Sequence, residues 1–314
     1  MTGYIIKRLL QLVPMLLLVS LAVFGLVRLI PGDPAMVLTG PNAPRAAIEE
    51  LRQSMHLADP WYVQLGVWYQ HLFHGDLGYS YFLHRPVLQA IVERLPTTLG
   101  LTLGGLLVAV CLGIPLGVLA ALRHDTWFDR LAMAFATFGL SVPSFWLAIL
   151  LILVFSVYLR VLPAGGALWS LLPLSGKLAS LVLPSFSVGV MQGAIVARLT
   201  RSSVLDILTQ EHVKVAQAKG LSWTKVVVKH VLWNAMVPIS TVLGTIAIGI
   251  FGGLVVIETV FTLPGVGRLV VQAVLQRDYP VIQGTLLITA VVYSLLNLLV
   301  DLSYSIMDPR ITYV

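Results

Sequence analysis

Long apolar blocks alternate with shorter polar segments along this chain of 314 residues. The apolar blocks lie at approximately 9–30, 96–122, 131–159, 179–197, 236–258 and 281–305. A helix of about 20 predominantly apolar residues is long enough to cross the hydrocarbon core of a bilayer. The fourth block is the weakest, because it contains Pro184 and several small residues. The pattern predicts an all-α membrane protein with six transmembrane helices.

The composition supports a membrane protein and excludes an ordinary soluble domain. Hydrophobic residues make up 58% of the chain and charged residues only 11%, whereas soluble domains carry about 25% charged residues. The net charge of +6 could indicate a nucleic-acid partner, but the basic residues lie in loops beside the apolar blocks, so we expect no nucleic acid. The first block is longer than the apolar core of a signal peptide, and no A-x-A cleavage pattern follows it. We therefore interpret this block as a retained helix.

The basic residues also predict an orientation. Eleven Lys and Arg residues lie in the segments 1–8, 123–130, 198–235 and 306–314, and only eight lie in the longer segments 31–95, 160–178 and 259–280. Because Lys and Arg concentrate on the cytoplasmic side, the first group is predicted to be cytoplasmic, with both termini inside. We divide the chain into a first transmembrane helix (1–30), an extracytoplasmic cap (31–95) and a core domain with spans two to six (96–314).

The cap is predicted to be small and helical, because apolar residues recur at helical spacing in it. Asp59 and Pro60 fit an N-cap followed by a first-turn proline, and Gly75 fits a helix end. The aromatic residues of the second predicted helix offer an alternative interpretation, in which they lie at the level of the lipid headgroups. These aromatics are Trp61, Tyr62, Trp68 and Tyr69.

The inner loop 198–235 is too long and too patterned to be a simple connection. Most of it can be helical, and Gly220 is a natural break. Val213, Ala216 and Gln217 are predicted to share one helix face. A basic helix lying on anionic lipid and a docking element for a soluble partner fit this pattern equally well.

No catalytic site is predicted in the chain. The phosphate-binding pattern G-x-x-x-x-G-K-[ST] does not occur, because Gly176–Lys177 has Leu171 at the first glycine position and Leu178 at the hydroxyl position. His71, His74 and His84 lie close together in the cap sequence and could form a weak metal site. Surface histidines are commoner than ligands in such a segment, so we predict no metal.

Several further residues have structural interpretations. Cys111 lies inside an apolar block and is read as a packing residue. Three polar residues lie near the ends of spans, where an interhelical hydrogen bond or interfacial solvation is expected rather than a proton relay; they are Glu258, Asn297 and Asp301. Small-residue pairs that allow close helix packing, and also dimerisation, occur at Gly100/Gly104, Gly113/Gly117 and Gly189/Gly193.

Six short motifs add a resemblance to these observations. They are VKVAQAKG at 213–220 with the sequence that follows to Pro238, Pro31-Gly32-Asp33-Pro34, Gly75-Asp76-Leu77-Gly78-Tyr79-Ser80, FTLPGVG at 261–267, Arg277-Asp278-Tyr279-Pro280 and Asp308-Pro309-Arg310. In this order, and over essentially the whole chain, they resemble the binding-protein-dependent permeases of ABC importers. The match is closest to the B-type subunits of the oligopeptide, dipeptide and nickel branch. The first motif resembles the EAA loop, although Lys214 and Val215 stand in its first two positions and Pro238 comes late.

The resemblance implies a type I ABC importer permease fold in the cytoplasmic (inner) membrane of a prokaryote. A short helix at about 206–219 would dock on an ATP-binding subunit, with Ala216 and Ala218 allowing close approach and Gly220 turning the chain. The implied docking residues of this coupling loop are Val213, Lys214, Ala216, Ala218, Lys219, Gly220 and Leu221. The implied outer signature consists of Gly32, Asp33, Pro34, Gly75, Asp76, Gly78, Asp278, Tyr279 and Pro280.

The resemblance also implies partners. They are a second, homologous permease forming a heterodimer with this chain, two ATP-binding subunits that hold Mg-ATP, an extracytoplasmic binding protein, and membrane lipid. This chain itself would hold no cofactor.

The implied function is import of dipeptides, oligopeptides or peptide-sized solutes. The alternatives are a nickel or metal-chelate importer of the same branch, a secondary transporter driven by an ion gradient, and a membrane scaffold without transport.

Overall fold

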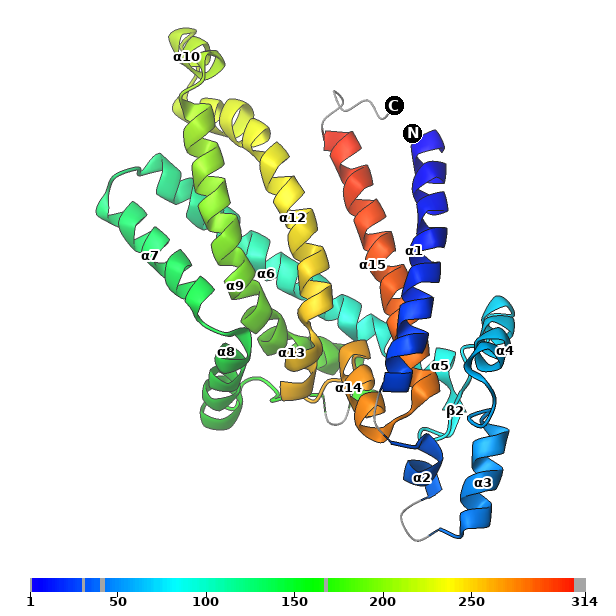
Figure 1. Cartoon of the computed structure of the whole chain (residues 1–314). Helices are drawn as coiled ribbons and strands as arrows, with labels where there is room; N and C mark the ends of the chain where they lie inside the picture. Colours follow the sequence, from blue (N-terminus) through cyan, green and yellow to red (C-terminus); the bar gives the residue numbers. More distant parts are fainter. Residues whose placement is uncertain (1, 30–31, 40–42, 167–168, 308–314) are drawn as a thin grey trace. The chain divides into compact units, whose positions relative to one another are not determined.

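The computed structural model describes residues 2–29, 32–39, 43–166 and 169–307, and these are almost wholly helical (Figure 1). The predicted tail motif Asp308-Pro309-Arg310 and the residue Pro31 lie outside the described residues. The first elements are α1 (Thr2–Leu29), α2 (Pro34–Thr39), α3 (Arg45–Ser54), α4 (Trp61–Phe73), β1 (Tyr79–Ser80), β2 (Arg85–Pro86) and α5 (Val87–Val92). The middle elements are α6 (Leu95–Leu122), α7 (Trp127–Ser141), α8 (Ser144–Leu151), the π-helix η1 (Ile152–Tyr158), the 3-10 turn η2 (Trp169–Leu171), α9 (Leu174–Leu208) and α10 (Glu211–Ala218). The last elements are α11 (Trp223–Lys225), the π-helix η3 (Val226–Leu232), α12 (Trp233–Gly253), α13 (Val255–Val260), α14 (Val266–Gln276) and α15 (Tyr279–Met307).

The apolar helices bear out a multi-span protein. Among the described residues, five helices are long and apolar enough to cross a bilayer, and a sixth span is obtained if α7 and α8–η1 count as one. The five are Leu10–Leu29, Val87–Leu122, Leu174–Leu208, Trp223–Gly253 and Tyr279–Leu302. The predicted fourth block is the core of a 35-residue helix, and Pro184 lies inside that helix without ending it.

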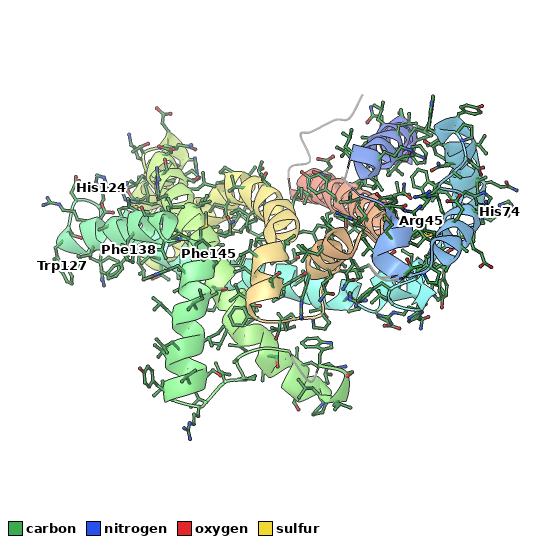
Figure 2. All side chains as sticks on the ribbon, turned by 60° about the horizontal axis from the view of Figure 1, so that its bottom comes forward. Arg45, His74, His124, Trp127, Phe138 and Phe145 are labelled. Carbon is green, nitrogen blue, oxygen red and sulfur yellow. The ribbon has the colours of Figure 1, made fainter. Side chains whose placement is uncertain are left out.

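The expectation of one unbroken third span over 131–159 is wrong. The chain bends by 98° between Trp127–Ser141 and Ser144–Tyr158, and Figure 2 shows Phe138 and Phe145 on either side of this bend. Val142 has an extended backbone (φ −86°, ψ 121°). The cause is Pro143, which disfavours the helical conformation of the preceding residue and has no N–H to continue the helix.

The described chain divides into two compact units, and each is discontinuous in sequence. The first unit consists of 1–97 and 264–295, and the second of 98–263 and 296–314. Both α6 and α15 therefore contribute to both units. Residues 264–295, which follow α13, therefore belong to the same unit as the N-terminal cap. The predicted division into 1–30, 31–95 and 96–314 had placed these residues in the core domain.

In the first unit, the cap contains the two predicted helices, α3 and α4, and a short antiparallel hairpin. The hairpin pairs Tyr79 with Pro86 and Ser80 with Arg85. The expected N-cap at Asp59 is wrong: Pro60 is the N-cap of α4, and the Asp59 carboxylate instead accepts a hydrogen bond at 2.8 Å from the His56 ring. Gly75 follows the end of α4 at φ +76°, as predicted for a helix end.

The aromatic residues of α4 divide between two roles. Trp68 stacks on Phe24 of α1 with ring centroids 5.8 Å apart, and the Tyr69 hydroxyl lies 2.7 Å from Ser20 Oγ. Trp61 and Tyr62 are exposed. The α4 helix is therefore packed on the first span through Trp68 and Tyr69, and of the four aromatics considered from the sequence only Trp61 and Tyr62 are exposed.

In the second unit, the predicted small-residue pairs bring α6 and α9 into backbone contact. A Cβ atom on Gly113 would lie 2.6 Å from the Gly193 carbonyl oxygen, and one on Gly117 would lie 2.5 Å from that of Ala197. A Cβ on Gly189 would lie 2.5 Å from Val108. The pairs thus serve packing within this chain, which was one of their two expected uses.

We expect Gly117→Ala to destabilise the protein, because the added methyl group has no room against α9. Overpacking of this kind costs about 1–3 kcal/mol. The matched control is Gly252→Ala in α12, where no described side chain or neighbouring backbone lies within 4 Å and alanine is the better helix former. Thermal unfolding in detergent should show a lower midpoint for the first variant only, and equal midpoints would contradict the packing described.

Candidate functional site

The coupling loop forms a helix of its own at the end of α9. The single helix expected at about 206–219 is interrupted: α9 ends at Leu208, and α10 begins at Glu211 after the extended residue Gln210. Figure 1 shows α10 beyond the end of α9. The α10 helix ends in a Schellman motif, in which Gly220 has φ +76° and the Leu221 N–H donates to the Ala216 carbonyl at 3.4 Å. The predicted turn at Gly220 is therefore confirmed.

The α10 helix has one buried face and one exposed face. Val213 and Ala216 are buried in a cluster of the chain's own apolar residues. The other members of this cluster are Ala121, Val204, Ile207, Val226, Val231, Ala235 and Ile239. Gln217, expected on the same face, is exposed. The side chains of Val213 and Ala216 thus hold α10 against the ends of α6, α9 and α12.

The exposed surface of α10 and its turn is made by the remaining predicted residues. They are Lys214, Ala218, Lys219, Gly220 and Leu221, joined by Val215 and Gln217. Val215 was not among the predicted docking residues, yet about half of its surface is exposed. An exposed valine between two lysines gives this surface both an apolar point and a positive charge.

In the first unit, the structure brings together the three outer-signature motifs, which are far apart in the sequence. Asp33 caps α2 by accepting a hydrogen bond from the Ala35 N–H at 2.9 Å, and Asp76 accepts one from the Gly78 N–H at 2.8 Å. Each carboxylate therefore shapes its own glycine-containing turn.

Glycines allow the motifs to touch. Gly32 (φ +113°) lies against the Arg277 guanidinium so closely that a Cβ atom would be 2.0 Å from Nη1. Gly78 (φ +90°) lies against Pro280, which a Cβ would approach to 3.3 Å. Both positions combine a backbone conformation that favours glycine with a close neighbour, so the glycines are needed for two reasons.

A buried hydrogen bond joins the second motif to the third. The Ser80 hydroxyl donates to Asp278 Oδ2 at 2.5 Å, and Ser80 Oγ accepts from the Leu83 N–H at 2.9 Å. Both Ser80 and Asp278 are at least 95% buried. This bond fixes the hairpin β1–β2 to the start of α15. Ser80 was part of the quoted motif but not of the predicted site, and only the fold could give it a partner 198 residues away.

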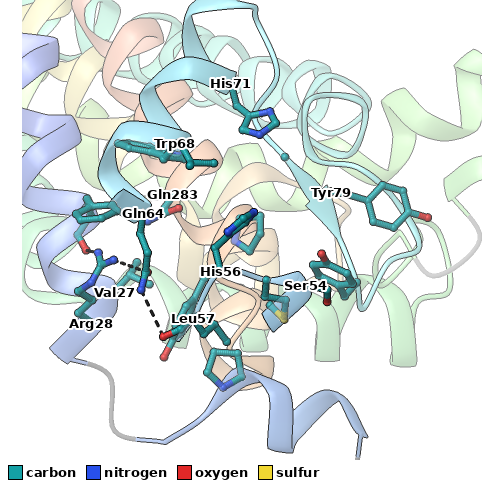
Figure 3. A pocket seen from close by; sticks show the side chains of 18 of the residues that line it. Val27, Arg28, Ser54, His56, Leu57, Gln64, Trp68, His71, Tyr79 and Gln283 are labelled. Atoms are coloured by element: carbon teal, nitrogen blue, oxygen red, sulfur yellow. Dashed lines mark hydrogen bonds between the residues drawn. The ribbon is translucent and has the colours of Figure 1, made fainter. Parts of the chain in front are cut away.

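The three motifs surround a cavity of about 640 Å³ (Figure 3). Seven of the nine predicted signature residues line it: Gly32, Asp33, Pro34, Asp76, Gly78, Tyr279 and Pro280. Lining residues outside the predicted signature include Arg28, Arg52, His56, Gln64 and Tyr81, together with Tyr79, which belongs to the quoted motif at 75–80. The signature residues thus form a single structural site, although Gly75 and Asp278 do not themselves line the cavity.

The charged groups of this cavity are paired within the unit. Arg52 forms an ion pair with Asp33 and a second with Glu49 at 2.9 Å. Arg28 donates to Gln64 at 2.5 Å and lies over the Phe24 ring. The cavity therefore presents aromatic and hydrogen-bonding groups rather than a strong net charge.

The cap histidines do not assemble the metal site considered from the sequence. The His71 ring bonds Asp76 at 3.1 Å, and the His74 ring bonds the Gln70 carbonyl at 2.7 Å. In the part of the chain that the structure describes, His71, His74 and His84 do not form a group whose ligand atoms could share one ion.

Burial raises the pKa of the Asp278 carboxyl above its ordinary value, although the hydrogen bond from Ser80 acts in the opposite direction. The folded protein then holds this proton more tightly than the unfolded chain. Its stabilising contribution is present below the ordinary aspartate pKa of about 3.9 and is lost as the pH rises through the folded-state pKa. We expect the melting temperature of the native protein, relative to Asp278→Asn, to fall as the pH rises from about 4 to 7.

The matched control for this pH series is Asp125→Asn, which replaces an exposed carboxylate. Its melting temperature in detergent should change with pH in the same way as that of the native protein. If the melting temperature of Asp278→Asn also followed the native pH dependence, ionisation of Asp278 would not weaken the fold.

The comparisons with known proteins agree over the whole chain. Residues 113–313 match the family model described as binding-protein-dependent transport system inner membrane component, and residues 1–102 match that of its N-terminal part. A protein of Brucella abortus named as a peptide transport system permease is 45% identical over 313 residues, covering 100% of both chains. The glutathione transport system permease protein GsiC of Escherichia coli K12 is 42% identical over the same coverage.

The fold also has a counterpart among solved structures. A chain of the MetNI methionine ABC transporter, in an inward-facing conformation, matches with a TM-score of 0.59 at 18% identity, over 70% of this chain and 97% of that one. The chain therefore belongs to the family of binding-protein-dependent transport system inner membrane components, and it is a multi-pass ABC importer permease with an all-α type I fold.

Proposed function

We propose that this chain is the B-type permease subunit of an ATP-driven importer for dipeptides, oligopeptides or peptide-sized solutes. The names of the Brucella and Escherichia relatives support the substrate class. The observation that carries the ATP-driven part is α10, a short helix with a buried face on its own chain and an exposed face turned away from it.

In this proposal, the exposed face of α10 docks in a groove of an ATP-binding subunit. Val213 and Ala216 hold the helix to the permease, so the contact falls to Lys214, Val215, Ala218 and Leu221. This replaces the expectation that Ala216 allows close approach of the partner. A rigid helix held by buried residues can transmit a push, because close-packed interiors deform little.

Family membership implies ATP-binding and substrate-binding components, and we propose their composition. Two ATP-binding subunits hold Mg-ATP, and this chain holds no cofactor and hydrolyses nothing itself. A second, homologous permease shares the transport path with this chain. The cap, which carries six of the nine outer-signature residues, lies outside the membrane and receives substrate from the binding protein, and both termini of this chain lie in the cytoplasm.

Uptake by the reconstituted complex tests the substrate class. The complex and its binding protein would be placed in liposomes containing ATP, with a labelled dipeptide, glutathione and a nickel–histidine chelate offered separately. ATP-dependent uptake of a peptide is the expected result. Uptake of the nickel chelate without any peptide would overturn the substrate assignment while leaving the ATP-driven permease in place.

A further inference from the structure

A partly buried ion pair outside the coupling loop and the outer signature joins two helices of the second unit. Arg201 of α9 donates to both carboxylate oxygens of Asp129 in α7, from Nε and from Nη2, each at 2.6 Å. This fork is the strongest geometry that an arginine and a carboxylate can adopt. Asp129 is only 3% exposed.

The local backbone holds Asp129 in place for this bond. Asp129 lies in the first turn of α7, whose N-cap is Thr126, and its Oδ2 also accepts the Asp125 N–H at 3.1 Å. The far end of α7, marked by His124 and Trp127 in Figure 2, is therefore tied to α9 and not only packed against it. The ion pair therefore joins the two helices at a residue whose position is already held by its own backbone.

The position of Arg201 gives the tie its significance. Arg201 lies ten residues before Glu211, on the same helix that leads into α10. Close packing of Gly117 against Thr200 fixes this level of α9 to α6, with 2.6 Å between the position of a Cβ and Thr200 Cβ. The end of α9 from Arg201 to Leu208, here called the loop arm because it leads into α10, is thus joined to α6 by close packing and to α7 by the ion pair.

The α7 helix leads to an irregular part of the described membrane region. It ends at the 98° bend before Pro143, beyond which α8 continues into the π-helix η1. A bend of this kind can change its angle at little cost, because no helical hydrogen bond has to break at the proline. Movement imposed on the start of α7 would then appear as a change at this bend.

We propose that Asp129 and Arg201 are positioning residues that join the arm of the coupling loop to α7, so that a displacement of α10 moves the bent span α7–α8. This proposal rests on the proposed docking function of α10. It adds that the ion pair transmits the displacement of α10 to α7. The proposal gives neither residue a contact with substrate or nucleotide.

The test uses the complete complex in liposomes, with glutathione as the transported probe. The double variant Asp129→Asn/Arg201→Gln removes both charges together, so no uncompensated buried charge remains. Glu50→Gln is the matched control, because this exposed carboxylate lies on α3, in the other compact unit. We expect the double variant to assemble and hydrolyse ATP, but to use about fivefold or more ATP per glutathione molecule imported, as expected for losing a typical coupling free energy.

A distance measurement distinguishes positioning from simple stabilisation. Spin labels at Thr209→Cys and Phe138→Cys, with Cys111→Ser, report the separation of the loop arm and α7 with and without ATP and vanadate. The native pair should keep one narrow distance distribution in both states, and the double variant should show a distribution that changes with nucleotide.

The proposal is overturned if the double variant has a lower melting temperature yet keeps the native ATP-to-substrate ratio and the native distances. Arg201→Lys gives an independent check, since it retains the charge but not the fork and should show an intermediate ratio. Failure of the docking function itself is recognised separately, because Gly220→Val would then leave uptake unchanged.

Discussion

Gly220→Val should reduce ATP-dependent uptake by about 5- to 30-fold while the chain still inserts in the membrane. Gly220 has φ +76°, a conformation that costs an L-residue about 1–2 kcal/mol and is least tolerated by β-branched side chains. A strain of this size shifts an equilibrium by the stated factor. Because the turn closes the Schellman motif of α10, the strain falls on α10, the proposed docking helix, and not on the spans. ATP hydrolysis in the partner subunits should fall less than uptake does, so that more ATP is used per solute imported.

Open space around Gly220 makes this prediction specific to the backbone. Apart from its two chain neighbours, no described atom lies within 4 Å of a Cβ at this position, so valine would meet no steric clash within this chain. Gly220→Asn is the matched control, because asparagine tolerates the left-handed region and should retain most of the uptake. Normal transport by Gly220→Val would refute the assignment of α10 as the docking helix.

Glu258→Ala should destabilise the permease by about 1–3 kcal/mol, the typical cost of removing one partner of a buried hydrogen bond. Glu258 is fully buried in the second unit, and the Thr98 hydroxyl donates to its Oε1 at 2.6 Å. Alanine leaves the Thr98 hydroxyl without this acceptor and removes the volume of the side chain. The measurement is the midpoint of thermal unfolding in detergent.

Glu258→Gln and Glu50→Ala are the controls for this effect. The glutamine retains an amide oxygen that can accept from Thr98, so its loss should be clearly smaller. Glu50 is exposed on α3, and its removal should change the midpoint little. A Glu258→Ala protein as stable as Glu50→Ala would mean that the buried hydrogen bond makes no contribution.

Features that depend on local backbone chemistry could be predicted from the sequence. Gly75 and Gly220 each end a helix at positive φ, and a glycine after an amphipathic stretch indicates this directly. Gly113, Gly117 and Gly189 lie where two helices approach within backbone contact, as small residues at spacing of four indicate. In each case glycine permits a backbone conformation or a close helix approach that few other residue types allow.

Features that depend on mean hydropathy alone were predicted less well. The block 131–159 is apolar throughout, so hydropathy passes over the bend at Pro143, although the proline itself was a visible signal. Pro184 shows why the signal is ambiguous, since the same residue type lies inside α9 without ending it. Neighbouring helices can satisfy a backbone that proline interrupts, and the sequence does not say where they do.

Contacts between distant residues could not be predicted at all. Ser80 meets Asp278 across 198 residues, and Asp129 meets Arg201 across 72. Resemblance named the motif that contains Asp278 but gave it no partner. The burial of Ala216 is a related case, because the face that a short helix turns inward depends on the cluster beneath it.

Purification of this chain in mild detergent, with mass spectrometry of the proteins that accompany it, measures the proposed function most directly. An ATP-driven permease should bring with it two ATP-binding subunits and a second, homologous permease, and the Gly220→Val chain should recover the permease with less of the ATP-binding subunits. Recovery of this chain without any nucleotide-binding partner, even after crosslinking, would contradict the proposal and favour a transporter driven by an ion gradient.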